Sequence, residues 1–351
     1  MKVLLLGGTG AIGNYLIDQL IKAGYNVTVT SRSERLSNKS NLSFIQGNAK
    51  DLSFIQTLDS NWDAIVDFMS YQTDEFQQNY LTLLNLTRHY VFLSSARVYA
   101  DSKTPIVEDS LRLLDASKDK EYLATDDYSL AKARQENILR DSGHKNYSIV
   151  RPYITYGTYR LQLGVLEKEE WLYRAMQGRT IIFCKDIEDK YTTMTSGYDV
   201  ANCILSIIAT CANGESYNLT NNYRITWGSI FDVYKKAIFD GLKRHVLVHY
   251  ISLDEFINLF RPEKEKYQIT VDRVYNRFFD NSKIAKLIDV NSFIHPEKAL
   301  YACTSEFLHA PRFKGINWQK EANNDRITNE WASIKDIHEV KSIIKYIINR
   351  F

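Results

Sequence analysis

The chain has 351 residues, of which 44% are hydrophobic and 25% are charged, and this composition is that of a folded globular protein rather than a disordered one. Its 44 Lys and Arg residues are nearly balanced by 42 Asp and Glu residues, and a net charge of +2 lacks the basic excess typical of nucleic-acid-binding proteins. We therefore expect no nucleic-acid partner. The length predicts two domains, or one large α/β domain with an appended lobe.

The four cysteines are scattered and form no C-x-x-C pair, so the sequence indicates neither a disulfide framework nor a zinc site. The apolar run Val3 to Leu6 is too short for a signal peptide and passes directly into a glycine-rich turn. No later apolar run approaches the ~20 residues of a membrane span. We expect a cytoplasmic protein without a metal ion and without a membrane contact.

Strand and helix patterns alternate through the first half of the sequence. Short runs of β-branched, aromatic and leucine residues predict strands at 2–6, 26–31, 42–46, 64–68, 90–94 and 147–150. Apolar residues at helical spacing predict helices at 11–23, 52–58, 73–86 and 128–142. This alternation is typical of an α/β fold with a doubly wound parallel sheet, covered by helices on both faces.

The pattern becomes less regular after residue 151. It predicts helices at 165–176, 197–210, 226–237, 253–260 and 334–349, a strand at 217–219, and an exposed polar connector at 320–326. We predict a dinucleotide-binding domain over 1–157, completed by segments near 195–240. A smaller mixed substrate-binding lobe would span 158–194 and 241–319, followed by a C-terminal extension over 320–351.

The sequence GGTGAIG stands between the first predicted strand and the first predicted helix. Glycines at such a turn let the backbone approach a pyrophosphate, and the helix N-terminus favours its negative charge. This placement predicts a Rossmann-type dinucleotide site. Its expected contacts are Gly7, Thr9, Gly10, Ala11, Ile12 and Gly13.

Two further motifs carry candidate catalytic side chains. Tyr128 and Lys132 are four residues apart at the head of a predicted helix, which puts the ammonium near the phenol, although such a spacing is also common in surface pairs. Ser94 and Ser95 follow a predicted buried strand, where ligands of open α/β sheets bind. The alternative interpretation is a pair of turn or capping serines.

Together these motifs resemble the extended short-chain dehydrogenase/reductase family, in its branch of NAD(P)-dependent nucleotide-sugar epimerases, dehydratases and reductases. The resemblance covers roughly residues 1–310 and implies a Rossmann-type fold. Further similar segments, in sequence order, are the adenine-side turn QGNAKD at 46–51, RPYITYG at 151–157, DVA at 199–201, YNL at 217–219 and DNSK at 280–283.

The resemblance implies that Tyr128 is the general acid/base, that Lys132 holds the cofactor ribose and favours the phenolate, and that Ser95 hydrogen-bonds the substrate oxygen, with Ser94 as the alternate. It further implies cofactor contacts at Asn48, Ala49, Phe68, Ser94 and Arg151. Substrate contacts are expected at Tyr71, Arg97, Tyr153, Tyr156 and Arg273. Arg273 or Arg277 would have to replace the family's phosphate clamp, yet a solvated surface arginine is the more frequent case for either.

The end of the second predicted strand bears on the choice of cofactor. Arginine accommodates the 2′-phosphate of NADP, whereas an acid holds the ribose of NAD. Here Ser31 and Arg32 come first and Glu34 follows. The sequence therefore favours NADP, and Glu34 keeps NAD as the alternative.

One departure from the family pattern bears on which of the family's reactions this chain performs. The family's dehydratases carry an Asp-Glu pair where this chain has Ala96 and Arg97, so dehydration is disfavoured. The resemblance then implies hydride transfer at C4 of a nucleoside-diphosphate sugar, by an epimerase or a keto-reductase, and it allows a homodimer. The alternative is a non-catalytic dinucleotide-binding regulatory or interaction protein on the same fold.

Overall fold

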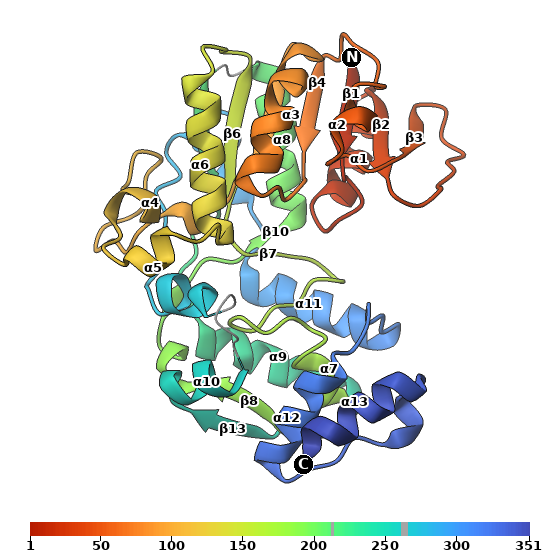
Figure 1. Cartoon of the computed structure of the whole chain (residues 1–351), viewed down its shortest axis with the longest axis vertical. Coiled ribbons are helices and arrows are strands. Elements are labelled where there is room, and N and C mark those ends of the chain that lie inside the picture. The colour runs from red at the N-terminus through yellow and green to blue at the C-terminus, as the bar shows by residue number, and fades with distance from the viewer. Residues whose placement is uncertain (212–213, 261–265) are drawn as a thin grey trace. The chain divides into compact units, whose positions relative to one another are not determined.

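The structure is a computed structural model that describes residues 1–211, 214–260 and 266–351 (Figure 1). Their contacts divide the chain into two compact units. The first consists of Met1–Thr155, Thr193–Tyr223 and Arg277–Ile294, and the second of Tyr156–Thr192, Arg224–Asn276 and His295–Phe351. The stretch 195–240, expected to complete the first domain, is thus shared between both units.

The first unit is built on a seven-stranded sheet with the order β11-β6-β5-β4-β1-β2-β3. All neighbouring strands in it are parallel. The order reverses between β1 and β4, and such a switch point is where open α/β sheets bind ligands. The strands are β1 (Lys2–Leu6), β2 (Asn26–Ser31), β3 (Leu42–Gln46), β4 (Ala64–Asp67), β5 (Tyr90–Leu93), β6 (Tyr147–Pro152) and β11 (Glu215–Leu219).

Helices cover both faces of this sheet. In β1, Val3 and Leu5 point into an apolar cluster with α1 (Gly13–Lys22) and α8 (Gly197–Thr210). Leu4 and Leu6 point to the opposite cluster, as alternation along a strand requires. That cluster includes side chains of α2 (Leu52–Ile55), α3 (Thr73–Asn85) and α6 (Tyr128–Asp141), of which α3 and α6 lie side by side in Figure 1. The predicted doubly wound, Rossmann-type α/β fold is confirmed.

Local capping decides where α6 begins. The side chain of Asp127 accepts the backbone N–H of Ser129 at 3.1 Å, which satisfies one of the unpaired donors of the first turn. Tyr128 is therefore the first residue of the helix. The other short elements of this unit are η1 (Ala96–Val98), α4 (Leu113–Ala116), α5 (Lys120–Leu123), β10 (Thr195–Ser196), η4 (Ile284–Lys286) and η5 (Val290–Ser292).

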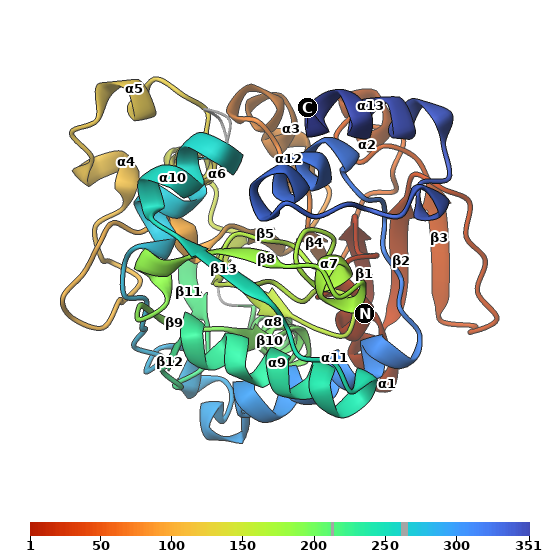
Figure 2. The ribbon, with the colours of Figure 1, turned by 90° about the horizontal axis from the view of Figure 1, so that it is seen from below.

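In the second unit, helices α9 (Trp227–Leu242) and α11 (Pro296–His309) pack against each other. Strands β8 (Ile181–Cys184) and β13 (Val248–Ile251) form a parallel pair, visible in Figure 2. The remaining elements are β7 (Thr155–Tyr156), which begins in the first unit, α7 (Leu172–Met176), η2 (Lys185–Ile187), β9 (Tyr191–Thr192), β12 (Ile225–Thr226), α10 (Leu253–Phe260), η3 (Ile269–Arg273), α12 (Trp318–Thr328), η6 (Ile334–Asp336) and α13 (Val340–Arg350). None of the helices among the described residues has the length and apolar character needed to span a membrane.

The prediction of an exposed connector at 320–326 is wrong, because these residues belong to α12. Glu321 and Asp325 are buried there, at 3.0 and 2.8 Å from one guanidinium nitrogen of Arg174. Arg179 pairs with the same two carboxylates. A polar sequence can enter a protein interior when its charges are paired in this way. The helix predicted at 165–176 is also shorter than expected, since α7 begins only at residue 172.

Candidate active site

The turn between β1 and α1 is shaped by its glycines. Gly7 has a φ of +70°, and its N–H donates to Thr30 Oγ1 at 3.0 Å. A Cβ at Gly13 would lie 2.1 Å from the carbonyl oxygen of Gly8, so only glycine allows the first residue of α1 to come this close to the backbone of the turn. A Cβ at Gly10, in contrast, would meet no atom within 4 Å. The turn is open at Gly10, beside the helix N-terminus that would receive a pyrophosphate.

The other predicted residues of this turn differ in their exposure. Thr9 and Ala11 are partly exposed and Ile12 is buried in the core. Sequence reasoning missed Gly197, the first residue of α8, where a Cβ would lie 2.8 Å from the carbonyl oxygen of Ala11. The available signal was a glycine two residues before the DVA segment. The N-terminus of α8 therefore lies against the backbone of the glycine turn.

Ser31 and Arg32 lie where β2 ends, as predicted. Ser31 Oγ accepts the Ser33 N–H and the Nε–H of Arg35, both at 3.3 Å. Arg32 and Glu34 are exposed. Arg35 was missed by sequence reasoning, although it follows Arg32 by only three residues. The end of β2 thus carries two guanidinium groups and one carboxylate.

Four further predicted cofactor and substrate contacts lie after β3 and β4. Asn48 is exposed, and its Oδ1 accepts the Lys50 N–H at 3.3 Å. Ala49 is buried, and its carbonyl accepts the Tyr71 hydroxyl at 3.2 Å. Phe68 follows the last residue of β4 and is partly exposed. Tyr71 is only 3% exposed, so in this structure its hydroxyl forms hydrogen bonds inside the protein.

The two candidate serines have different surroundings. Ser94 is buried and donates its hydroxyl to Glu136 Oε1 at 2.6 Å. Ser95 is 6% exposed and its Oγ accepts the Arg97 N–H at 3.2 Å, which starts the short helix η1. That contact uses an oxygen lone pair and not the hydroxyl proton. Ser95 therefore has the better arrangement to donate a hydrogen bond to a ligand.

Tyr128 and Lys132 occupy successive turns of α6. Tyr128 is 37% exposed, and the guanidinium carbon of Arg97 lies 5.1 Å from the centroid of its ring. Lys132 is 2% exposed; its Nζ donates to the Met69 carbonyl at 3.2 Å and lies 4.5 Å from the Phe92 ring centroid. Burial lowers the pKa of Lys132 to about 8.

Neighbouring strands bring these groups together. β1, β4 and β5 are adjacent in the sheet, and their carboxyl ends lead into Gly7, Met69 and Ser95. A Cβ at Gly7 would lie 2.6 Å from the Met69 sulfur, and the carbonyl of Met69 accepts the Lys132 ammonium. Ser95 precedes η1, which packs against α6 and places Arg97 over Tyr128. The glycine turn, Ser95, Tyr128 and Lys132 thus face one edge of the sheet.

Arg151, predicted to touch the cofactor, is fully buried. Its Nε and Nη2 donate to the two oxygens of Glu136, both at 2.7 Å, and its Nη1 donates to the Tyr99 hydroxyl at 2.5 Å. Although burial opposes ionisation, Arg151 and Ser94 hold the pKa of Glu136 below its usual range. In this structure Arg151 braces β6 against α6.

The expectation that Arg273 and Arg277 are solvated surface residues is wrong. Arg277 is fully buried and donates to the carbonyls of Ala100 at 2.7 Å and Tyr99 at 3.0 Å. Arg273, in the second unit, is 2% exposed, donates to the Gly164 carbonyl at 3.0 Å and pairs with Asp272. Carbonyl and carboxylate acceptors satisfy both guanidinium groups, so burial is tolerated.

The two remaining predicted substrate residues are also buried. Tyr153 belongs to the first unit, and its ring centroid lies 5.6 Å from that of Phe279. Tyr156 is the first residue of the second unit and is fully buried.

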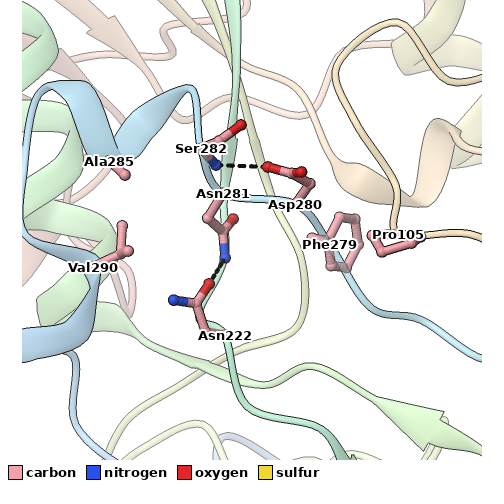
Figure 3. Close-up of a pocket in the computed structure, with 8 residues that line it drawn as sticks. All are labelled: Pro105, Asn222, Phe279, Asp280, Asn281, Ser282, Ala285 and Val290. Carbon is pink, nitrogen blue, oxygen red and sulfur yellow. Dashed lines mark hydrogen bonds between the residues drawn. The ribbon is translucent and has the colours of Figure 1, made fainter.

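A separate cavity of about 340 Å³ lies in the first unit (Figure 3). Asn281 donates to the Asn222 side chain at 2.8 Å, and the Ser282 N–H donates to Asp280 at 2.7 Å. The lining residues are Pro105, Asn222, Phe279, Asp280, Asn281, Ser282, Ala285 and Val290. The cavity contains none of the predicted site residues, so we do not assign it to the candidate active site. Over the described ranges, no three His, Cys, Asp or Glu side chains are arranged to hold a metal ion.

Residues 3–221 match the model of the NAD dependent epimerase/dehydratase family. The chain belongs to this family. The family resemblance found in the sequence is thereby confirmed, and the match ends two residues before the second stretch of the first unit does.

Individual relatives are more distant. The chain is 25% identical over 268 residues to the chloroplast stem-loop binding protein of 41 kDa b from Arabidopsis thaliana, a match over 71% of this chain and 66% of that protein. It is 28% identical over 133 residues to a UDP-glucose 4-epimerase from Lactobacillus helveticus, over 31% of this chain and 40% of that enzyme. The chain thus spans less than two thirds of these relatives.

The fold is shared with solved epimerase structures. UDP-glucose 4-epimerase from Bifidobacterium longum, in complex with NAD+ and UDP, matches with a TM-score of 0.65 at 18% identity. The match covers 89% of this chain and 99% of that one. At this level of identity the likeness shows the fold alone.

Proposed function

We propose that this chain is an NAD(P)-dependent enzyme that transfers a hydride at C4 of a nucleoside-diphosphate sugar, as a 4-epimerase or a keto-reductase. The observation that carries the proposal is the convergence of the glycine turn, Ser95, Tyr128 and Lys132 at the carboxyl ends of β1, β4 and β5. A dinucleotide site needs only the glycine turn. A positioned phenol, ammonium and hydroxyl beside it are the groups of an acid/base reaction.

The protein groups have distinct roles in this reaction. Lys132 holds the ribose hydroxyls and favours the phenolate of Tyr128, and Ser95 donates a hydrogen bond to the sugar O4. Tyr128 accepts the O4 proton when the C4 alcohol is oxidised and returns a proton when the carbonyl is reduced. The bound dinucleotide supplies the hydride acceptor or donor. Exposure of the Tyr128 side chain supports its access to a substrate.

The cofactor we favour is NADP. Arg32 is exposed at the end of β2, and Arg35 reaches Ser31 there, so two cations are available to a 2′-phosphate. NAD stays the alternative because of Glu34 and because the Bifidobacterium longum enzyme is in complex with NAD+.

The substrate class rests on two observations. The related Bifidobacterium longum structure holds UDP, and the Lactobacillus helveticus relative is a UDP-glucose 4-epimerase. We propose that the first unit holds the dinucleotide and that the second contributes the sugar-nucleotide contacts. The proposed location is the cytoplasm, and the family resemblance allows a homodimer.

A single experiment separates the two reactions. The purified protein is incubated with UDP- and dTDP-hexoses and with their 4-keto forms, in the presence of oxidised or reduced NAD or NADP, and the products are analysed by mass spectrometry and NMR. An epimerase changes the C4 configuration without net consumption of cofactor. A reductase consumes NADPH only with a keto-sugar. Absence of either product with every UDP- and dTDP-sugar would contradict the proposal.

A second candidate function is a non-catalytic binding protein on the same fold. It is favoured by the similarity to the stem-loop binding protein of Arabidopsis thaliana. The net charge of +2 opposes a nucleic-acid partner. Binding of a dinucleotide without turnover, together with retention of a labelled RNA hairpin, would favour this candidate.

A further inference from the structure

A buried carboxylate lies directly behind the candidate site. Asp67 is the last residue of β4 and is fully buried. Its Oδ1 accepts the Met69 N–H at 2.8 Å. Its Oδ2 accepts the hydroxyl of Tyr90 at 2.6 Å. The single hydroxyl proton of Tyr71 is shared between this oxygen, at 3.1 Å, and the Ala49 carbonyl, at 3.2 Å. These donors are uncharged, so the groups that bond Asp67 directly do not neutralise the negative charge of its carboxylate.

Such a group is costly at a position where an apolar residue would continue the strand. Burial raises the pKa of Asp67, and the bonds from Tyr90, Met69 and Tyr71 oppose this only in part. The preceding strand residues, Ile65 and Val66, are apolar and fully buried. A carboxylate retained against its desolvation cost is a candidate for a functional role.

The carboxylate fixes the turn that follows β4. Its bond to the Met69 N–H closes the turn, and the bond from Tyr71 ties down the other end. Helix α6 binds this same turn twice. Lys132 donates to the Met69 carbonyl at 3.2 Å, and Gln135 Nε2 donates to the Tyr71 carbonyl at 2.8 Å. The position of the Lys132 ammonium thus depends on a turn that Asp67 holds.

The charge of Asp67 also favours the ammonium form of Lys132. Burial disfavours the ammonium form of Lys132, whereas the carboxylates of Asp67, from β4, and Glu136, from α6 itself, favour it. Lys50, from the segment before α2, opposes it. The Phe92 ring of β5 also faces the ammonium. Glu136 is shared with the Arg151 guanidinium, so Asp67 is the carboxylate in this set without a guanidinium on it.

We propose that Asp67 is a positioning residue that keeps Lys132 charged and directed toward the cofactor ribose, through the Met69 turn and through its own negative charge. The inference rests on the proposed function only in the assignment of the ribose contact to Lys132. It adds a residue that lies outside the glycine turn and outside the Ser95, Tyr128 and Lys132 set.

The test is the substitution Asp67→Asn, which keeps the size of the side chain and an acceptor for the Met69 N–H but removes the charge. NMR of ¹³C-labelled lysines, with the Lys132 signal assigned from Lys132→Met, measures the titration of Lys132 directly. We expect its midpoint to fall by about one pH unit, which is about a tenfold change in the ratio of charged to neutral lysine. NAD(P) affinity should then decline at correspondingly lower pH.

Tyr90→Phe is the matched control, because it removes one neutral donor from Asp67 and leaves the charge. Its Lys132 midpoint should stay within about 0.3 pH units of the wild type. A shifted midpoint without a shifted affinity profile supports the role of Asp67 and contradicts the ribose contact of Lys132, so the two proposals fail separately.

An unchanged Lys132 midpoint in Asp67→Asn would overturn the inference. If that variant does not fold, the reciprocal measurement replaces it: in Lys132→Met the titration of the ¹³C-labelled Asp67 carboxyl should move to higher pH, because a nearby cation has been removed. Equal Asp67 midpoints in wild type and Lys132→Met would overturn it as well.

Discussion

Arg97 lies over the ring of Tyr128, with its guanidinium carbon 5.1 Å from the ring centroid. A cation above an aromatic face is attracted to the ring, and this contact holds η1 against the start of α6. Ser95 and Tyr128 are thereby kept at the same edge of the sheet. The residue that stands in place of a dehydratase acid therefore has a structural partner in the proposed acid/base.

Replacing Tyr128 by Phe should lower turnover by the ~10²–10⁴-fold typical of a lost acid/base, because phenylalanine cannot carry the proton. Cofactor affinity and thermal unfolding should change little. The matched control is Tyr198→Phe, an exposed tyrosine of α8 whose loss should not affect turnover. Steady-state kinetics and cofactor titration check both variants, and turnover within tenfold of wild type would remove Tyr128 from the mechanism.

Charge reversal in Arg32→Glu should raise the NADP dissociation constant by at least about tenfold, since a charge-assisted contact to the 2′-phosphate becomes a repulsion. The NAD constant should change much less. Arg88→Glu, at an exposed arginine paired with Asp63 across 3.6 Å, is the control for net charge. Calorimetric titration with both dinucleotides decides, and equal effects on the two would contradict the NADP assignment.

Dehydration should be absent, because Ala96 is buried and carries no acid, and Arg97 lies on the Tyr128 ring instead of offering a proton to a leaving hydroxyl. With a nucleoside-diphosphate hexose in deuterated water, the sugar should lose no water, and no 4-keto-6-deoxy product carrying solvent deuterium at C5 should form. Mass spectrometry checks this. A 4-keto-6-deoxy product would show that an acid from elsewhere in the chain reaches the sugar.

Glu136→Gln should destabilise the protein by about 3–5 kcal/mol, because it leaves the buried Arg151 guanidinium without its counter-charge. The control is Asp115→Asn. Its carboxylate pairs with Arg112 at 2.8 Å but is 42% exposed, so its loss should cost less than about 1 kcal/mol. Urea unfolding monitored by fluorescence gives both values, and equal costs would mean that burial of the Glu136 pair is not what matters.

Asp199→Asn should stabilise the protein at neutral pH. Burial raises the pKa of Asp199 to about 6, above that of the unfolded chain, even though the Ile294 N–H donates to its carboxylate. The native state therefore holds a proton that the unfolded state releases, and stability falls as pH rises from about 4 to about 6. The free energy of unfolding of the variant should equal that of the wild type at about pH 4 and exceed it by about 2 kcal/mol at about pH 8. Urea unfolding at both pH values measures this, and a constant difference would contradict it.

Local sequence patterns were sufficient for the sheet and for the order of the motifs. Strands at 2–6, 26–31 and 42–46 lie as predicted, because short runs rich in β-branched, aromatic and leucine residues favour strands and are visible in the sequence itself. The glycine turn and the Tyr128/Lys132 spacing are likewise local. Both motifs can be recognised from residues that are close to one another in the sequence, at the end of a strand or in the first turns of a helix.

Only the tertiary structure decided which polar side chains face the candidate site and which are paired with other groups in the protein interior. Lys132 meets the carbonyl of Met69, 63 residues away in the sequence, and Arg174 meets Asp325 across 151 residues. No local pattern marks such pairs, because the favourable free energy of a buried charge comes from a partner that only the fold brings near. For the same reason α12, with its polar sequence, was predicted as a connector, and Arg277 was predicted at the surface.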